Sequence, residues 1–372
     1  MRGVLQLRTP QGDGNQSEPL SLSSAPVSSI EPRVRFRDSQ IEMAHGAGGK
    51  ASRRLVEGLF APLLFGSSAE PLTDSARVLV DRTSVAVTTD SFVVSPLSFP
   101  GGSIGELAIN GTVNDLAVSG ARPEAIVVTF ILEAGLPASV LESEVRAMAD
   151  AARRANVKVV GGDTKVVEHG KADLMYVTAT GIGSPIPALT IDPRSVRAGD
   201  KVLLSGPVGD HGITILLARG ELDIEAELRS DTRSVYPFVE AISGAAGAAI
   251  RWMRDPTRGG VATSLNELAR DCGLGIYLEE EELPVHDEVR GACELLGLDP
   301  LHIANEGQCI AIVAAEYADV ALAAIHQTPG GGDARIIGEV REQPAATVLV
   351  GTRYGGTRVI DMLVGDPLPR IC

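Results

Sequence analysis

The chain ends on a cysteine, and this residue type in this place could act as a nucleophile. Cys372 closes the run Pro369-Arg370-Ile371-Cys372. A terminal residue seldom holds a core together, whereas a thiolate is a strong nucleophile even near neutral pH. Pro367 and Pro369 fix φ and favour an extended course, so the tail should behave as a semi-stiff arm. We therefore predict a mobile arm that carries a reactive sulfur. The alternative is a cysteine that merely ends the chain.

Acidic residues recur directly after predicted strands or in glycine-rich junctions. They are Asp74, Asp90, Asp115, Asp163 and Asp255, and Asn114 precedes Asp115. Carboxylate and amide oxygens suit Mg²⁺ held between protein and phosphate. Each residue taken alone could equally be a turn or helix cap. Together they favour a nucleotide-phosphate site.

Three other side chains could act on a bound substrate. Lys165 follows a glycine turn and could contact a phosphate or stabilise developing negative charge, although it could also be a surface lysine. Glu306 precedes an apolar strand and could be a general base or only cap the strand end. His211 could contact a phosphate, but we favour a turn residue. Cys272, Cys293 and Cys309 lie in apolar settings and are interpreted as core thiols.

Composition narrows the class of protein. A length of 372 residues predicts two domains, and a hydrophobic content of 44% predicts a globular fold. The net charge of −15 argues against a nucleic-acid or anionic-membrane partner. Four scattered cysteines without a CxxC pair fit a reducing cytoplasm. No apolar run approaches the roughly 18–20 residues of a membrane span. Residues 1–40 read as a disordered extension without a signal peptide.

Alternating strand and helix patterns predict an α/β or α+β fold in two units, 41–185 and 194–350, followed by a mobile tail at 351–372. In the first unit we expect strands at 78–80, 85–89, 125–132, 157–160 and 174–180, with helices at 104–118 and from Ser139. In the second we expect strands at 201–204, 276–278, 309–313, 335–337 and 347–350, and helices at 213–218 and 261–269. The turn His45–Lys50 does not meet the phosphate-loop spacing GxxxxGK[ST], because Ala occupies position 44 and Ala51 follows Lys50.

Several of these motifs, taken in order, resemble the hydrogenase maturation family HypE. The resemblance rests on 45–50, 88–94, 110–116, 162–165, 254–260, 305–307 and the terminal run 369–372, and covers roughly 41–372. That family belongs to a wider group resembling aminoimidazole ribonucleotide synthetase and selenophosphate synthetase. The Cys-ended tail is the most specific feature, and residues 1–40 have no counterpart.

The resemblance implies two α/β units and a homodimer whose N-terminal sheets close into a shared β-barrel. It also implies an ATP-Mg²⁺ site. The metal and phosphate ligands carried over are Asp74, Asp90, Asn114, Asp115, Asp163, Thr164 and Asp255, with Thr164 and Asn114 on the phosphate side only. In this family the terminal cysteine, here Cys372, accepts a carbamoyl group from HypF. The S-carboxamide is dehydrated with ATP to an S-cyanate, and cyanide passes to iron on the HypC–HypD complex for [NiFe] hydrogenase. Glu306 would be the base and Lys165 would orient the amide.

Two rival functions remain open. A small-molecule kinase or synthetase of the wider group would use the same ATP site with a free substrate, and would not need Cys372. A non-enzymatic scaffold would bind a metal or a partner thiol through Cys372 and an internal cysteine. Metal analysis and a test for ATP hydrolysis separate this function from the two enzymatic ones.

Overall fold

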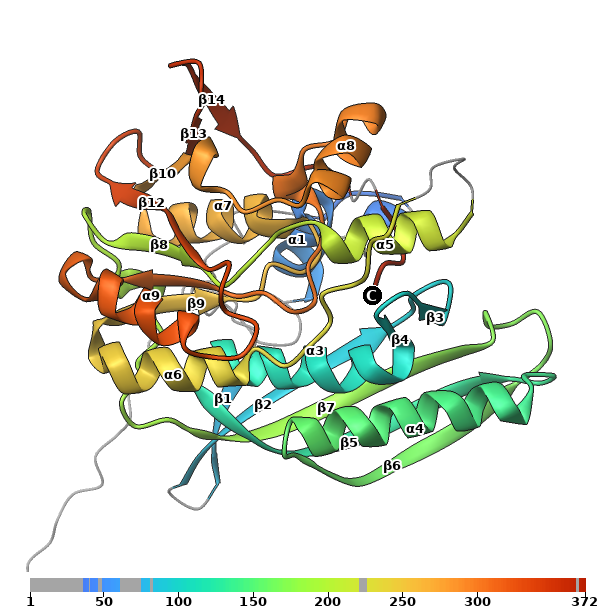
Figure 1. The fold of residues 1–372 in the computed structure, drawn as a ribbon. Helices are drawn as coiled ribbons and strands as arrows, with labels where there is room; N and C mark the ends of the chain where they lie inside the picture. The colour runs from blue at the N-terminus through green and yellow to red at the C-terminus, as the bar shows by residue number, and fades with distance from the viewer. Residues whose placement is uncertain are drawn as a thin grey trace, which may run out of the picture.

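The computed structural model describes residues 36–39, 41–45, 49–60, 75–80, 83–220, 226–365 and 368–372. Asp74, the glycines at 46 and 48, Pro367 and nearly all of the predicted extension 1–40 lie outside these ranges. The chain forms two sheets with helices (Figure 1). Among the described residues no helix is both long and apolar enough to cross a membrane.

The first sheet is five-stranded, in the order β1-β2-β7-β5-β6. Its strands are β1 (Ala76–Val80), β2 (Thr83–Phe92), β5 (Ala121–Glu133), β6 (Lys158–Val167) and β7 (Met175–Pro185). All neighbours are antiparallel except β5 and β6, which are parallel and are joined through a helix. The short pair β3 (Ser98–Phe99) and β4 (Gly102–Ser103) lies before the first long helix.

Helices α3 (Ile104–Val118) and α4 (Ala138–Arg154) cover one face of this sheet, and no described element covers the other (Figure 1). Phe92, Val128 and Val177 alternate with less buried neighbours and pack into the core beneath the helices. The uncovered face carries polar rows such as Ser91, Thr178 and Thr129. Both edge strands are largely exposed.

The second sheet has seven strands in the order β14-β13-β10-β12-β8-β11-β9. They are β8 (Lys201–Leu204), β9 (Ile250–Arg254), β10 (Gly275–Glu279), β11 (Ile310–Val313), β12 (Arg335–Arg341), β13 (Val348–Gly351) and β14 (Thr357–Ile360). Its helices are α5 (Asp210–Ala218), α6 (Tyr236–Ala246), α7 (Gly260–Cys272), α8 (Asp287–Leu296) and α9 (Ala318–His326). Short 3₁₀ turns, among them η5 (Glu280–Glu282) and η6 (Pro300–His302), complete the unit.

Strand β11 is apolar at every position, and β8 at its last three, because both faces of this sheet are covered. Leu203 of β8 packs with α6 and α9, whereas its neighbours Val202 and Leu204 pack on the opposite face with α7. The same alternation divides β11. A two-sided core of this kind explains why the sequence shows a short continuous apolar run there.

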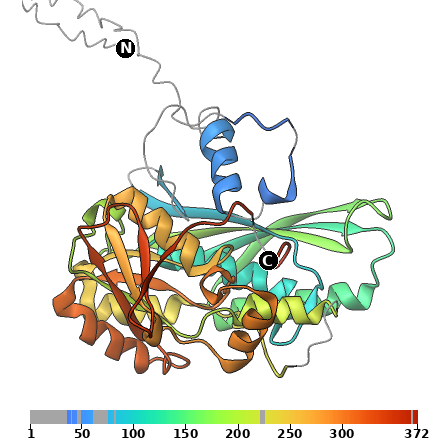
Figure 2. The same ribbon diagram turned by 90° about the horizontal axis from the view of Figure 1, so that it is seen from above.

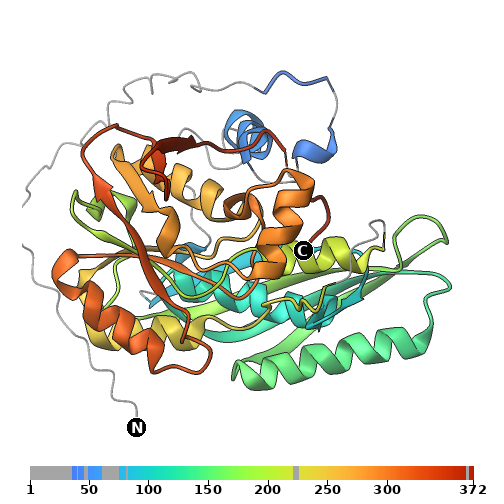
Figure 3. The same ribbon diagram turned by 45° about the horizontal axis from the view of Figure 1, so that its top comes forward.

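The N-terminal segment adds α1 (Gly49–Leu55) and a π-helical turn η2 (Val56–Phe60). Figure 2 shows α1, in blue, at one side of the molecule. The C-terminus lies next to α5 (Figures 1 and 3).

Several predicted boundaries are wrong: β5 (Ala121–Glu133), β7 (Met175–Pro185) and β12 (Arg335–Arg341) are longer than predicted. Strand β6 does not stop at Val160 but continues through Lys165, because pairing with β5 holds the glycines in the strand. Helix α5 begins at Asp210, so His211 is helical rather than a turn residue. Strand β2 runs to Phe92. The chain also stays in the second sheet beyond 350, since β14 pairs with β13.

Candidate active site

Carboxyl groups from four segments lie close together at Glu306, and of these Glu306 and Asp255 are buried and Asp90 and Asp231 half-buried. The side chain of Glu306 is only 3% exposed. Burial raises the pKa of Glu306 well above its ordinary value, and the nearby carboxylates of Asp255, Asp90 and Asp231 raise it further. Arg258 is the cation that opposes this shift. The structure thus brings together three predicted site residues, Glu306, Asp255 and Asp90, and adds Asp231.

Asp231 supports the backbone of the Asn-Glu-Gly motif. Its carboxylate accepts hydrogen bonds from the N–H groups of Glu306 (3.0 Å) and Gly307 (3.1 Å). Burial raises the pKa of Asp231 to about 6. A side chain at position 307 would meet the Asp231 carbonyl oxygen at 1.8 Å, so glycine is required for this approach. The sequence offered no signal for Asp231, which lies in a loop far from any predicted strand end.

Asn114 also holds this region in place. Its buried amide donates to the carbonyl oxygens of Arg233 (3.0 Å) and Glu306 (3.2 Å), and its oxygen accepts from the N–H of Val235 (2.7 Å). The amide therefore joins α3 to two segments of the second unit. Its role as a phosphate ligand stays a prediction.

Replacing Asn114 by alanine should lower the free energy of unfolding by about 3 kcal/mol, because three buried backbone groups lose their partner. Asn110 on the same helix is the matched control, since its amide makes one bond, to Thr232 (3.3 Å). Asn110→Ala should cost about 1 kcal/mol. Urea unfolding of both variants measures the difference. Equal losses would contradict the bridging role.

The remaining predicted ligands differ in their surroundings. Asp115 accepts a hydrogen bond from Thr88 Oγ1 at 2.7 Å, beneath the first sheet. Asp163 and Thr164 are exposed on β6, and Lys165 Nζ lies 2.6 Å from Asp163 Oδ2, which lowers the pKa of Asp163. Asp74 lies outside the described residues.

Within one chain Lys165 does not reach the carboxylates around Glu306. Asp90 is level with Gly162 across the sheet, so Asp163 and Lys165, one and three residues further on, point to the opposite, uncovered face. Three strand spacings, about 14 Å, also separate β2 from β6.

The tail is docked rather than free. Cys372 is 7% exposed, and an oxygen of its terminal carboxylate accepts a hydrogen bond from the Val93 N–H (2.9 Å) directly after β2. A side chain at Gly111 would lie 3.1 Å from the Phe92 ring and 3.8 Å from Glu306 Oε2. Phe92, the neighbour of Val93, is therefore next to Glu306 as well. The terminal cysteine lies at the same end of β2 as the carboxylate cluster.

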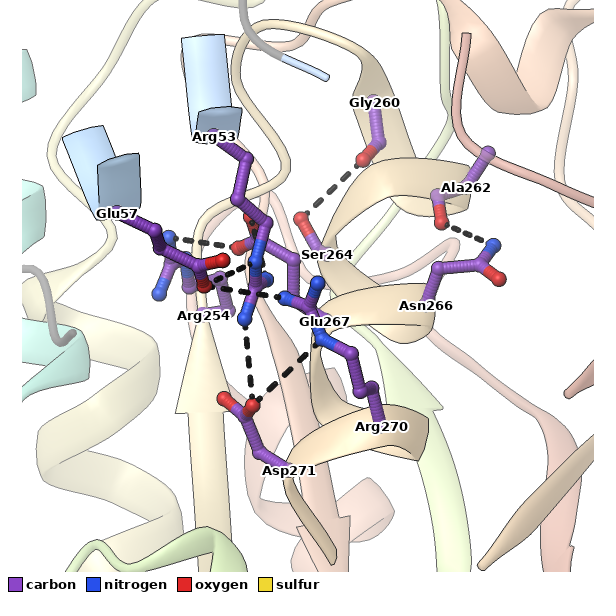
Figure 4. A network of polar contacts seen from close by, with 10 residues as sticks. All are labelled: Arg53, Glu57, Arg254, Gly260, Ala262, Ser264, Asn266, Glu267, Arg270 and Asp271. Carbon is purple, nitrogen blue, oxygen red and sulfur yellow. Dashed lines mark hydrogen bonds and ion pairs between the residues drawn. The ribbon is translucent and has the colours of Figure 1, made fainter. Parts of the chain in front are cut away.

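A cavity of about 420 Å³ adjoins this cluster, between α1 and the start of α7. Asp255 and Arg258 line the cavity and also act on Glu306. Ion pairs hold its walls together (Figure 4): Arg53 binds Glu267 (3.3 Å) and Asp271 (3.4 Å). Arg254 binds Glu267 as well (3.2 Å).

The donor set suits a cation shared with phosphate. Burial raises the pKa of Asp90, and the buried Oε1 of Glu306 has no hydrogen-bond partner among the described residues. The unpartnered oxygen and the neighbouring carboxylates of Asp255, Asp90 and Asp231 favour a bound cation here. In the described ranges no three His, Cys, Asp or Glu side chains could hold a metal ion by themselves. A Mg²⁺ ion here would need phosphate oxygens to complete its coordination.

The internal cysteines differ from the terminal one. Burial raises the pKa of Cys293 to about 11 and that of Cys309 to about 12. Both are buried, which confirms the interpretation as core thiols, whereas Cys272 is half-buried at the end of α7.

Glu306→Gln should raise the free energy of unfolding at pH 8, and the gain should vanish near pH 4. A carboxyl group whose pKa is raised by folding binds its proton more tightly in the folded state, so its stability contribution is present at low pH and is lost as the pH rises through the folded pKa. Glutamine does not ionise. Urea unfolding from pH 4 to 8 tests this, and a gain that does not depend on pH would contradict it.

Known proteins show the same architecture. The N-terminal domain of AIR synthase related proteins matches residues 73–184, and the C-terminal domain matches 197–351. The carbamoyl dehydratase HypE of Azotobacter vinelandii is 48% identical over 340 residues, which is 91% of this chain and 99% of that protein. HypE of Escherichia coli K12 is 44% identical over 90% of this chain and all of its own length. The chain belongs to the HypE family. Its fold is the two-domain α/β fold of the AIR synthase group.

Solved HypE structures agree with this family. A HypE crystal structure in complex with ATP is 42% identical, with a TM-score of 0.75, over 90% of this chain and all of that one. The HypE–HypF complex gives a TM-score of 0.78 at 41% identity, over 83% of this chain and 99% of that one. A ThiL structure complexed with AMPPCP and TMP, 23% identical with a TM-score of 0.64 over 84% of this chain and 96% of that one, shares the fold.

Proposed function

We propose that this protein is an ATP-dependent carbamoyl dehydratase of hydrogenase maturation, whose substrate is an S-carboxamide on its own Cys372. One observation carries the proposal: the terminal cysteine is docked at the end of β2, the strand whose Asp90 and Phe92 lie close to the buried Glu306. The names of its relatives support the same activity.

The chemistry needs an activated oxygen and a base. Phosphoryl transfer from ATP turns the amide oxygen into a leaving group, and removal of the N–H protons then gives the S-cyanate, ADP and phosphate. Glu306 is placed to take a proton, since its raised pKa makes it a stronger base than an ordinary carboxylate. Burial of the sulfur and of Glu306 excludes water from the intermediate.

ATP would occupy the cavity beside Asp255 and Arg258. Mg²⁺, when bound, would neutralise charge on the transferred phosphoryl group. We propose Asp90, Asp255, Asp115 and Asp74 as its ligands, with Asn114 on the phosphates. Asp163 as a metal ligand and Thr164 on the phosphates, both on the far edge strand β6, would join them only from a second copy of the chain. Asp90 and Asp255 have the strongest support, because they already act together on Glu306.

We further propose a homodimer in which two uncovered sheet faces meet in a shared barrel. The uncovered face exposes apolar side chains, including Val78 (45%) on β1 and Ile131 (39%) on β5. A second copy would cover this surface. Lys165 does not reach the site within one chain, so its proposed role in orienting the amide depends on this second copy.

Val78→Lys should therefore shift the protein from dimer to monomer, because a charge within an apolar contact must be desolvated. Val145→Lys on α4 is the matched control, since Val145 is exposed (43%) on the helical side. Light scattering after size-exclusion chromatography measures the mass. A monomeric wild type, or a dimeric Val78→Lys variant, would contradict the shared barrel.

The partners follow from the proposed reaction. HypF would donate the carbamoyl group, as the relative's complex with HypF supports. The HypC–HypD complex would accept cyanide. We place the reaction in the cytoplasm, where the four free cysteines stay reduced.

The activity can be tested by counting phosphate. Carbamoylated protein given ATP should release one phosphate per carbamoyl group and then stop, because each chain carries one substrate. The rival reading, a small-molecule kinase or synthetase, predicts continuous turnover with a free substrate and no dependence on Cys372. Either of those two results would overturn the proposal.

A further inference from the structure

The backbone of the tail is held at every one of its last four carbonyl groups. Arg219 donates to the carbonyl oxygens of Pro369 and Arg370 (2.9 Å for the second). His211 Nε2 binds the carbonyl oxygen of Ile371 at 2.6 Å, and Val93 N–H binds Cys372. This is a built peptide-binding groove rather than a chance contact, because the donors come from α5 and from the segment after β2.

The histidine bond at Ile371 is the most constrained of these contacts. A carbonyl oxygen can only accept, so Nε2 must carry the hydrogen. His211 is fully buried, which lowers its pKa to about 4 and keeps the ring neutral. Its Nδ1 must therefore accept, and the donor is the Ser230 hydroxyl at 2.8 Å. Ser230 Oγ in turn accepts from the Thr232 N–H (3.1 Å), and the Phe99 ring packs edge-on against the imidazole at 5.6 Å.

The segment 230–232 also supports the proposed base, Glu306. Ser230 and Thr232 flank Asp231, whose carboxylate accepts from the N–H groups of Glu306 and Gly307. The segment 230–232 thus binds the tail on one side, through His211, and Glu306 on the other. The length of this segment therefore fixes the distance between Ile371, the residue before the reacting cysteine, and Glu306.

We propose that His211, together with Ser230, is a positioning residue of the reaction: it fixes the register of the tail so that the group on Cys372 faces Glu306. The expected effect of His211 on dehydration rests on the proposed function, whereas its role in docking the tail does not. Arg219 closes the groove further back along the tail, whereas His211 acts one residue from the reacting sulfur. The groove accepts a C-terminal segment that turns at Arg370 (φ 57°) and has an apolar residue before the cysteine, since Ile371 is 1% exposed.

The test uses the full-length protein with His211→Phe, which keeps the ring size and removes the donor, and His211→Gln, whose amide restores a donor near the Nε2 position. His326→Phe is the matched control, because His326 Nε2 also binds a backbone carbonyl, that of Ala334 at 3.0 Å, at the far end of α9. Two rates are measured for each variant: alkylation of Cys372, followed by mass on the C-terminal peptide, and single-turnover formation of the S-cyanate.

For His211→Phe we expect alkylation about tenfold faster and dehydration about tenfold slower than in wild type, because an unpaired buried carbonyl disfavours the docked state. Carbamoylation by HypF should not slow. His211→Gln should recover most of both rates, and His326→Phe should match wild type. If His211→Phe does not fold, Ser230→Ala should show the same two changes in smaller measure.

Wild-type alkylation and dehydration rates in His211→Phe would overturn the inference, and so would a loss that glutamine does not rescue. The alkylation rate tests the docking role of His211 even if no S-cyanate forms. A wild type that fails to form S-cyanate while His211→Phe still exposes its thiol would refute the proposed function but not the docking role.

Discussion

Replacing Cys372 by serine is expected to abolish hydrogenase maturation completely. The hydroxyl has almost the same size, so the docked tail should be preserved, but it lacks the thiolate that the proposed carbamoyl transfer requires. The measurement is hydrogenase activity in cells that depend on this protein, together with the mass of the C-terminal peptide after incubation with HypF. No carbamoyl adduct should form.

Cys272→Ser is the control for this substitution, because Cys272 is a half-buried thiol remote from the tail. It should retain full activity. Normal maturation by the Cys372→Ser protein would show that the sulfur is not the carrier.

Replacing Glu306 by glutamine should slow dehydration by about 10³-fold, the usual contribution of a positioned general base. Glutamine fills the same volume and keeps the backbone bonds to Asp231, so the docked tail and the carbamoylation step should be unaffected. Rapid-quench measurement of the S-cyanate in a single turnover tests the expectation.

Glu281→Gln, on the exposed turn η5 of the same unit, should behave as wild type. A Glu306→Gln variant that dehydrates at the wild-type rate would remove Glu306 as the base. A variant that cannot accept the carbamoyl group would instead assign it to an earlier step.

Sequence patterns correctly predicted those helices and strands that are determined by residues close together in the chain. The helix α3 and the strand β8 have the bounds expected from their sequences, and α7 ends at Gly273, which adopts a positive φ of 73°. Predictions failed where pairing with a distant strand decides the structure. The glycines at 161 and 162 suggested a turn, yet the parallel partner β5 keeps them extended.

The residues of the candidate site also differ in whether the sequence alone could reveal them. Asp90 follows a predicted strand, Glu306 precedes one and Asp255 lies in a predicted glycine-rich junction, so all three could be singled out from the sequence. Asp231 and His211 could not be found, because their roles come from contacts with residues more than seventy positions away. The docked state of the tail was also hidden, since it depends on donors from α5 and from the end of β2.

The central claim is that this protein dehydrates a group carried on its own last residue. The most direct test is the mass of the C-terminal peptide after carbamoylation by HypF, measured before and after ATP is added. We predict that ATP removes the mass of one water from the carbamoylated peptide, and that Cys372→Ser shows neither the adduct nor the loss. A carbamoylated peptide whose mass is unchanged by ATP would contradict the account.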